Sequence, residues 1–179
     1  MTRRKIPKAV VARIRATAGN RCGYCLTPQR YAMQVLEIEH IIPRAVDETD
    51  DEENLWLACR LCNNAKAIKT HGYDPLTGRS VPLFNPRKQT WSRHFSWSDD
   101  GVRAIGRTAS GRATVETLKL NNEIALVVRQ NWVAAGWHPP EALRKSPVGV
   151  TARDCSEISV QVHIAARMRY PPPQNFFID

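Results

Sequence analysis

The two stretches Cys22-Gly-Tyr-Cys25 and Cys59-Arg-Leu-Cys62 decide how the middle of this chain folds. Thiolates two residues apart can reach one metal ion from a tight turn, and two such turns complete a tetrahedral site. The 33 residues between the pairs exceed what a minimal zinc finger needs, so further structure is expected inside the loop. The sequence therefore predicts a structural Zn²⁺ bound by Cys22, Cys25, Cys59 and Cys62, with disulfides or redox-active Cys-x-x-Cys motifs as the alternatives. Cys155 stands outside this pattern and is given no role.

The composition is that of a basic globular chain. It has 179 residues, of which 42% are hydrophobic, and a formal net charge of +9. No run of about 18 apolar residues occurs, so we expect a cytoplasmic protein with no membrane partner. The positive charge favours a polyanionic partner, although a basic surface also simply keeps a protein soluble. Residues 1–30 carry eight Lys and Arg and no Asp or Glu, whereas residues 31–60 carry two against eight.

Two segments have clear periodicity, one before the first cysteine pair and one between the two pairs. Residues 7–18 predict a basic amphipathic helix, because Pro7 suits a first helical turn and Gly19-Asn20 can end it. Residues 35–39 alternate apolar and acidic side chains, which indicates a strand with its carboxylates on one face. The acidic run over residues 47–53 is interpreted as a solvated turn.

A helix is predicted directly after the second cysteine pair. Residues 55–58 form a short apolar segment that leads into this pair, and residues 63–69 have the composition of a helix. Asn63 and Lys66 are three residues apart, so they share a helical face that can be turned toward the strand carrying Glu39. The predicted order of the core is therefore strand, loop and helix.

The run Glu39-His40-Ile41-Ile42-Pro43, followed by Asn54 and by Cys59-x-x-Cys62-Asn63-x-x-Lys66, resembles the HNH endonucleases over about residues 20–70. That family has a ββα-metal core. The resemblance implies that His40 is the general base, that Glu39 and Asn63 hold one divalent cation, and that Asn54 orients the loop carrying the base. Asn63 stands where the family usually has histidine. The HNH domain of RNA-guided CRISPR nucleases is similar in having asparagine there and lysine three residues later.

The chemistry of the proposed ligands supports a hard cation. A carboxylate and an amide oxygen suit Mg²⁺ or Mn²⁺, which would contact the scissile phosphate and stabilise the charge that develops on it. Lys66 is expected to stabilise the same charge. Asn64 remains an alternative ligand to Asn63, and Glu37 is either an auxiliary carboxylate near the cation or a solvated strand residue.

The residues after the core predict a folded extension. Residues 94–106 predict a hairpin with an Asp-Gly turn, and residues 114–120 and 122–135 predict two helices. Apolar residues of these helices are expected in a core, together with three aromatic residues that we assign to packing rather than to stacking on nucleic acid. These residues are Leu118, Leu120, Ile124, Val127, Val128, Trp91, Phe95 and Trp97.

The prediction as a whole is an α+β fold with a zinc-stabilised ββα-metal (HNH) core, a basic N-terminal helix and a C-terminal hairpin-plus-helices extension. The domain is expected to span residues 1–140, with the core at about 20–70 and the extension at 71–140; residues 141–179 have no assignment. The expected function is metal-dependent hydrolysis of phosphodiester bonds in DNA, with double-stranded DNA as the partner. A zinc-dependent nucleic-acid-binding module with a degenerate catalytic site is the alternative.

Overall fold

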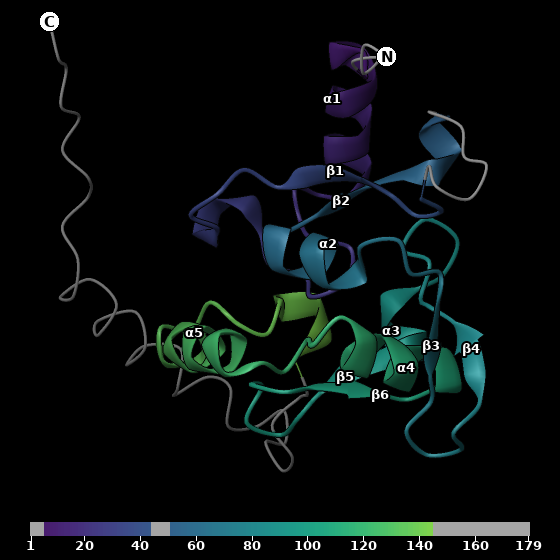
Figure 1. The fold of residues 1–179 in the computed structure, drawn as a ribbon. Helices are drawn as coiled ribbons and strands as arrows, with labels where there is room; N and C mark the ends of the chain where they lie inside the picture. The colour runs from purple at the N-terminus through teal and green to yellow at the C-terminus, as the bar shows by residue number, and fades with distance from the viewer. Residues whose placement is uncertain (1–5, 44–50, 145–179) are drawn as a thin grey trace, which may run out of the picture. The chain divides into compact units, whose positions relative to one another are not determined.

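The computed structural model describes residues 6–43 and 51–144, which belong to one compact unit, Met1–Arg144 (Figure 1). Cys155, residues 44–50 of the acidic loop and the segment from 145 onward lie outside the described residues. Strands in the described part form three two-stranded antiparallel sheets, and the predicted α+β class is confirmed. The helices and strands, in chain order, are α1 (Lys8–Thr17), η1 (Gln29–Tyr31), β1 (Glu37–His40), η3 (Glu52–Asn54), β2 (Leu55–Ala58), α2 (Arg60–Lys66), β3 (His71–Tyr73), β4 (Ser80–Pro82), α3 (Trp91–His94), β5 (Phe95–Trp97), β6 (Ala104–Gly106), α4 (Ala109–Thr117), α5 (Glu123–Ala134) and η4 (Glu141–Leu143).

Helix α1 lies where the sequence predicted an amphipathic helix. Pro7 precedes its first residue, and the chain leaves it through Gly19 and Asn20, both of which have positive φ angles. Such angles cannot continue a right-handed helix. Ile14 on its buried face is fully inaccessible to solvent and packs in a small cluster with residues of the hairpin beneath it, namely Leu36, Leu55 and Leu57. The N-terminal helix is therefore fixed to the core by apolar contacts.

The hairpin β1–β2 and helix α2 form the ββα unit of the core. In the antiparallel ladder Glu39 lies opposite Trp56 and His40 opposite Leu55. Helix α2 begins at Arg60 and ends at Lys66, so the predicted range 63–69 was wrong at both ends. Cys59 takes the N-cap position, and Ala67 ends the helix because its φ angle is 49°. The helix is consequently short, but Asn63 and Lys66 lie on it as predicted.

In the extension the predicted β-hairpin is confirmed and another was missed. Strands β5 and β6 pair in antiparallel register, and Gly101 in the turn between them has a φ angle of 74°. A left-handed position of this kind favours glycine. Strands β3 and β4 form an additional hairpin that the sequence did not predict. Its turn is held by Asp74, whose carboxylate accepts hydrogen bonds from Thr77 Oγ1 and from Nε and Nη2 of Arg112.

Both predicted helices of the extension exist, but the range 114–120 predicted for the first was wrong at both ends, since α4 ends at Thr117. Helix α4 begins at Ala109, five residues before Thr114, because the Thr108 side chain accepts a hydrogen bond from Gly111 N and caps the first turn. Helix α5 agrees with the predicted range 122–135, and Asn122 caps it by accepting from Ala125 N. These two caps are local signals of the kind that a sequence can show.

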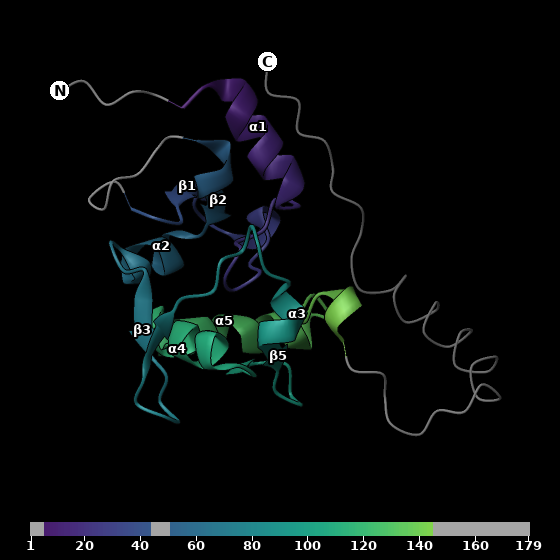
Figure 2. The ribbon, with the colours of Figure 1, turned by 90° about the vertical axis from the view of Figure 1, so that its right-hand side faces the viewer.

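The largest hydrophobic cluster joins the extension to the cysteine turns. Figures 1 and 2 show α3, α4, α5 and β5 on one side of α2, with α1 and the β1–β2 hairpin on the other. The cluster between them contains three of the cysteines and the apolar residues of the extension, including Cys22, Cys25, Cys62, Phe84, Phe95, Trp97, Leu118 and Leu120. The aromatic residues were thus correctly assigned to the core, with Trp91 partly buried against it. The metal-binding turns and the extension share one core.

Three apolar residues predicted to be buried in this core are not buried. Ile124, Val127 and Val128 are 66%, 56% and 36% exposed. The reason is that α5 buries a charged residue, Arg129, rather than an apolar stripe. Ile124 and Val128 instead line a cavity of about 510 Å³ between α5 and the cysteine turns.

Candidate metal centre and active site

Four cysteine side chains meet between the two Cys-x-x-Cys turns. Their sulfur atoms all lie within 4.8 Å of one another, and the Sγ atoms of Cys25 and Cys59 are 3.6 Å apart. A tetrahedral site with Zn–S bonds of about 2.3 Å separates its sulfurs by about 3.8 Å, so this arrangement fits such an ion. None of the four cysteines is in a disulfide. The cluster can therefore hold a metal ion, as predicted.

The backbone around the cysteines explains how two short motifs reach one point. In the first turn Cys22 N donates to Thr27 O and Leu26 N donates to Cys22 O, while Gly23 N donates to Leu57 O in β2. A Cβ atom at Gly23 would collide with the indole of Trp56, so this position of the turn requires glycine. The second turn leads directly into α2. Hydrogen bonds to β2 thus hold the first pair beside the second.

Hydrogen bonds within the cluster favour the thiolate form of Cys25. Burial raises the pKa of Cys22, whereas hydrogen bonds from Cys22, Cys59 and Cys62 lower the pKa of Cys25 well below its ordinary value. Thr27 Oγ1 lies 3.1 Å from Cys25 Sγ and adds to this effect. The thiolate is the form of cysteine that ligates metals, and a divalent ion drives the remaining thiols to the same form.

A buried ion pair connects β1 to α2. Lys66 Nζ lies 2.6 Å from Glu39 Oε1, and the two side chains are only 2% and 3% exposed. Tyr24, fully buried in the first cysteine turn, donates its hydroxyl to the same carboxylate oxygen at 3.1 Å. Burial raises the pKa of Glu39, and the ammonium of Lys66 opposes that rise. The second oxygen, Oε2, is buried without a hydrogen-bond partner, so it can serve as a cation ligand.

A second contact between β1 and α2 lies one turn earlier in the helix. Asn63 Nδ2 donates to Glu37 Oε2 at 2.7 Å. Glu37 and Glu39 thus both face α2, which agrees with the predicted face of carboxylates. Asn64, the alternative to Asn63, is exposed, whereas Asn63 is partly buried beside the strand. Asn63 is thus the asparagine of this pair that contacts β1, and Glu37 is its hydrogen-bond partner on the strand.

His40 lies at the end of β1, and Asn54 fixes the loop that follows it. Asn54 Oδ1 accepts from Ile42 N at 2.9 Å, Asn54 Nδ2 donates to Ile42 O at 3.0 Å, and Ile41 N donates to Asn54 O. The backbone carbonyl of His40 accepts from Lys66 Nζ at 3.0 Å. The backbone of half-buried His40 is therefore held by Lys66, and the loop after it is held by Asn54.

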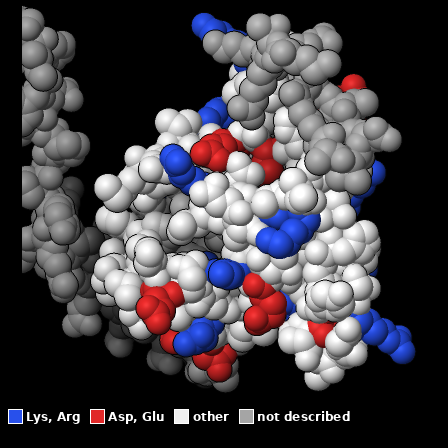
Figure 3. Space-filling view, in the orientation of Figure 1, with Lys and Arg blue, Asp and Glu red and all other residues white. Residues whose placement is uncertain are grey.

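Two arginines pair with Glu52 and Glu53 of the acidic run, which the sequence predicted to be a solvated turn. Glu52 Oε2 accepts from Arg13 of α1 at 2.7 Å, and Arg87 binds Glu53 at 3.0 Å. The side chain of Glu53 is nevertheless 79% exposed. On the face shown in Figure 3, Lys and Arg side chains are interspersed with Asp and Glu rather than gathered into one patch.

Comparison with known proteins finds similarity in the segment that contains this site. Residues 22–68 match the family model described as HNH endonuclease. The chain is also similar to the Septu protein PtuB of Bacillus thuringiensis, with 28% identity over 112 residues. That match covers 62% of this chain and 40% of the relative, so the chain spans less than half of the relative's length. No solved structure matches the chain significantly.

The structure joins Glu39 to Lys66, Asn63 to Glu37 and the four cysteines to one another, and it adds two residues to these contacts. Tyr24 was missed as a partner of Glu39, although its place inside Cys22-Gly-Tyr-Cys25 was a visible signal. Arg129 was missed because an arginine within an apolar helix pattern is ordinarily exposed; here it is 3% exposed.

No helix in the described residues is long and apolar enough to cross a membrane.

Proposed function

We propose that this protein is a metal-dependent endonuclease that hydrolyses phosphodiester bonds in double-stranded DNA. One observation carries the proposal: within the segment that matches the HNH family, contacts between β1 and α2 join Glu37 to Asn63 and Glu39 to Lys66, and His40 follows Glu39 on the strand. A binding module without catalysis needs no such set of carboxylate, amide and imidazole groups. The four-cysteine cluster, which we assign to structural Zn²⁺, supports this site from beneath through Tyr24.

His40 is the general base in this proposal. It takes a proton from a water molecule whose oxygen attacks the phosphorus, while the bond from phosphorus to the 3′ oxygen breaks. This leaves a 5′ phosphate and a 3′ oxygen that takes up a proton from solvent water to become a hydroxyl. General-base catalysis of this kind contributes roughly 10² to 10⁴-fold. Asn54 keeps the loop after His40 in place. Lys66 differs from the expectation, because its ammonium is buried against Glu39 and His40 O; we assign it to positioning rather than to contact with the phosphate.

Glu39 and Asn63 are the proposed ligands of the catalytic cation. The unpartnered Oε2 of Glu39 fits a hard cation, and an amide oxygen completes a donor set typical of Mg²⁺ or Mn²⁺. Such a cation stabilises negative charge on the phosphate and on the leaving oxygen. Glu37 holds the Asn63 amide through its Nδ2, which leaves Oδ1 as the ligand atom of that side chain. Glu37 is therefore a positioning residue for Asn63.

The proposal is tested by incubating the protein with supercoiled plasmid in Mg²⁺, Mn²⁺ or EDTA. We expect nicking that depends on the divalent ion and that His40→Ala reduces by about 10²-fold or more. Retained zinc content and DNA binding in the variant show that the fold survives. Equal cleavage by His40→Ala overturns the assignment of the base. DNA binding without cleavage in any metal favours the zinc-dependent binding module instead.

The neighbouring asparagines of α2 provide a matched control for the cation site. Asn63→Ala removes the amide that faces Glu37, whereas Asn64→Ala removes an exposed amide one residue further along the same helix. We expect Asn63→Ala to abolish cleavage at low Mg²⁺ and Asn64→Ala to leave it unchanged. The reverse pattern would identify Asn64 as the ligand.

A further inference from the structure

The four-cysteine centre would carry a buried negative charge when it binds a metal ion, and the two cysteine turns contain no buried cation to balance it. A divalent ion bound by four thiolates carries a net charge of −2, and three of the four cysteines here are buried, with 0%, 6% and 3% exposure for Cys22, Cys25 and Cys62. Burying a charge is costly unless an opposite charge is nearby. No Lys or Arg among residues 22–36 and 59–62 is buried, because Arg30 and Arg60 remain in contact with solvent.

Arg129 carries a buried positive charge, and its hydrogen-bond partners are neutral. Its side chain is 3% exposed, and a guanidinium cannot be deprotonated in a protein. It donates to Leu120 O at 2.7 Å, to Val102 O at 3.1 Å and to Asn121 Oδ1 at 3.3 Å, and it lies 5.1 Å from the ring of Trp97. These partners are neutral. In the part of the chain that the structure describes, no carboxylate lies within ion-pairing distance of Arg129.

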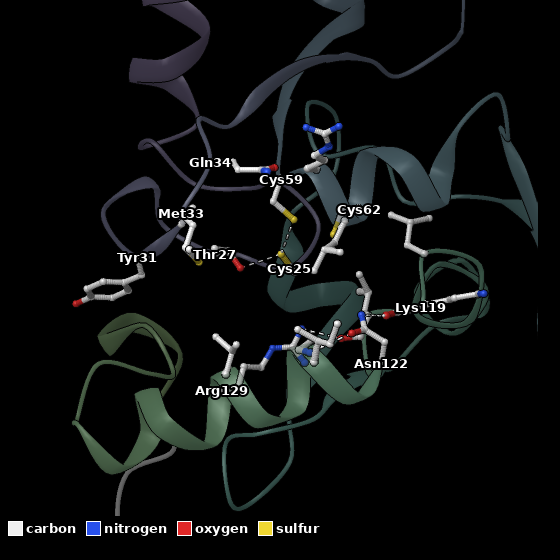
Figure 4. A pocket seen from close by; sticks show the side chains of 18 of the residues that line it. Cys25, Thr27, Tyr31, Met33, Gln34, Cys59, Cys62, Lys119, Asn122 and Arg129 are labelled. Atoms are coloured by element: carbon white, nitrogen blue, oxygen red, sulfur yellow. Dashed lines mark hydrogen bonds between the residues drawn. The ribbon is translucent and has the colours of Figure 1, made fainter.

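The two buried charges lie on the same cavity. Figure 4 shows Arg129 on the face of α5 that is turned toward Cys25, Cys59 and Cys62, and all four residues line the cavity of about 510 Å³. Burial lowers the pKa of Arg129, and attraction to the four cysteine sulfurs opposes that effect. The three neutral acceptors fix the orientation of the guanidinium without cancelling its charge. The cysteine centre is therefore the available counter-charge.

We propose that Arg129 is the electrostatic partner of the four-thiolate metal centre and that this pairing fastens helix α5 to the metal. Arg129 lies outside residues 22–68, so the metal site is completed by a helix that the family match does not include. Two other cations, Arg60 and Lys119, line the cavity but are exposed, so solvent screens their charges. Arg129 is a positioning residue for the metal centre, and the proposal does not depend on nuclease activity.

The test measures zinc affinity by competition with a chelator for the full-length protein and its variants. Arg129→Gln keeps an amide that can donate to the carbonyls but removes the charge; Arg129→Lys keeps the charge but alters the shape. Lys119→Met removes one positive charge from the same cavity at an exposed position. We expect Arg129→Gln to weaken zinc binding by about 10 to 100-fold, the range typical when groups supporting metal ligands are lost. Arg129→Lys should lie closer to wild type, and Lys119→Met should leave the affinity unchanged.

A purely structural role for Arg129 predicts a different result. In that case Arg129→Gln would destabilise the zinc-loaded and zinc-free proteins equally in urea and leave the zinc affinity unchanged, which would overturn the proposal. Equal losses of affinity in Arg129→Lys and Arg129→Gln would also overturn it, because the charge would then be irrelevant. If Arg129→Gln does not fold, the zinc affinity of Arg129→Lys tests the proposal instead. A loss of about 100-fold in that variant, which retains the charge, contradicts the pairing.

Discussion

The ββα core and the extension are stabilised by different interactions. The core buries ionised and polar groups that bind specific partners, with Lys66, Glu39 and Tyr24 meeting at one carboxylate oxygen. Apart from Arg129 and the pair of Asp74 and Arg112, the extension packs aromatic rings, with centroids 5.0 Å apart for Phe84 and Phe95 and 5.2 Å apart for Trp91 and Trp97. A buried charge that loses its partner costs about 3–5 kcal/mol, whereas trimming a ring to a smaller apolar side chain costs less. The difference teaches that the site is the less tolerant region, although both regions share one hydrophobic cluster.

The largest effect is expected from breaking the cysteine cluster. Structural zinc contributes roughly 10 kcal/mol or more of apparent binding free energy, which is as large as the total stability of most domains. We expect Cys62→Ser to lose bound zinc and to unfold the core together with the extension, because Cys62 belongs to their common cluster. Zinc analysis and thermal unfolding followed by circular dichroism check this result.

Cys155→Ser is the matched control for the cysteine variant, since Cys155 stands outside both Cys-x-x-Cys pairs. It should retain zinc and the wild-type unfolding temperature. If Cys62→Ser kept its zinc and unfolded cooperatively at the wild-type temperature, the cluster would not be the structural centre of this fold.

The next largest effect is expected at the buried ion pair. Lys66→Met leaves the Glu39 carboxylate buried without its cation, which typically costs about 3–5 kcal/mol. The double variant Lys66→Met, Glu39→Met removes both charges and should recover most of this loss. Urea unfolding of the zinc-loaded proteins measures both differences.

Phe95→Leu makes the corresponding change in the extension. Phe95 is 1% exposed, and replacing its ring by a smaller apolar side chain should cost less than about 3 kcal/mol, below the range of Phe→Ala changes. A loss from Phe95→Leu that exceeds the loss from Lys66→Met would reverse the contrast between the two regions.

The last effect is confined to acid pH and arises in the extension. Burial against Trp97 and the nearby charge of Arg129 lower the pKa of His138 to about 4. Because the folded pKa is below the unfolded value of about 6.5, the neutral side chain contributes stability above pH 6.5, and this contribution is lost as the pH falls toward 4. We expect His138→Gln to reduce the slope of the unfolding free energy against pH between those values. The reduction corresponds to the uptake of at most one proton on unfolding.

Chemical unfolding of zinc-loaded wild type and His138→Gln at several pH values between 7 and 4 measures these slopes. Acid also protonates the cysteine thiolates, but that effect is common to both proteins and cancels in the difference. Identical slopes would show that His138 does not change protonation on unfolding.

Local patterns predicted the ββα core well. The spacing of the cysteines, the alternation that contains Glu37 and Glu39, and the interval between Asn63 and Lys66 each reflect a short-range geometric rule, and the structure satisfies all three. The Asp-Gly turn before Val102 likewise predicted its hairpin. Boundaries failed where one residue's conformation decided them, as at Ala67, whose positive φ angle ends α2 early.

Periodicity failed where burial depends on distant partners. Helix α5 has an apolar pattern, yet it buries Arg129 and exposes Ile124, because the surface facing it contains backbone carbonyls and cysteine sulfurs. The hairpin of β3 and β4 was missed because Asp74, which holds its turn, is stabilised by Arg112, 38 residues away. A single sequence does not display such pairings.

The sequence by itself determined the chemistry of this protein: which side chains can bind metals, which can take a proton, and roughly which segments present them. Those properties depend on residue type and on separations of two to four positions, which the chain carries locally. The tertiary structure alone decided that Lys66 binds Glu39 rather than solvent, that Tyr24 supports the same carboxylate, and that Arg129 faces the cysteine centre. These contacts join residues distant in the chain, and desolvation, which acts only after the chain has folded, sets their strength.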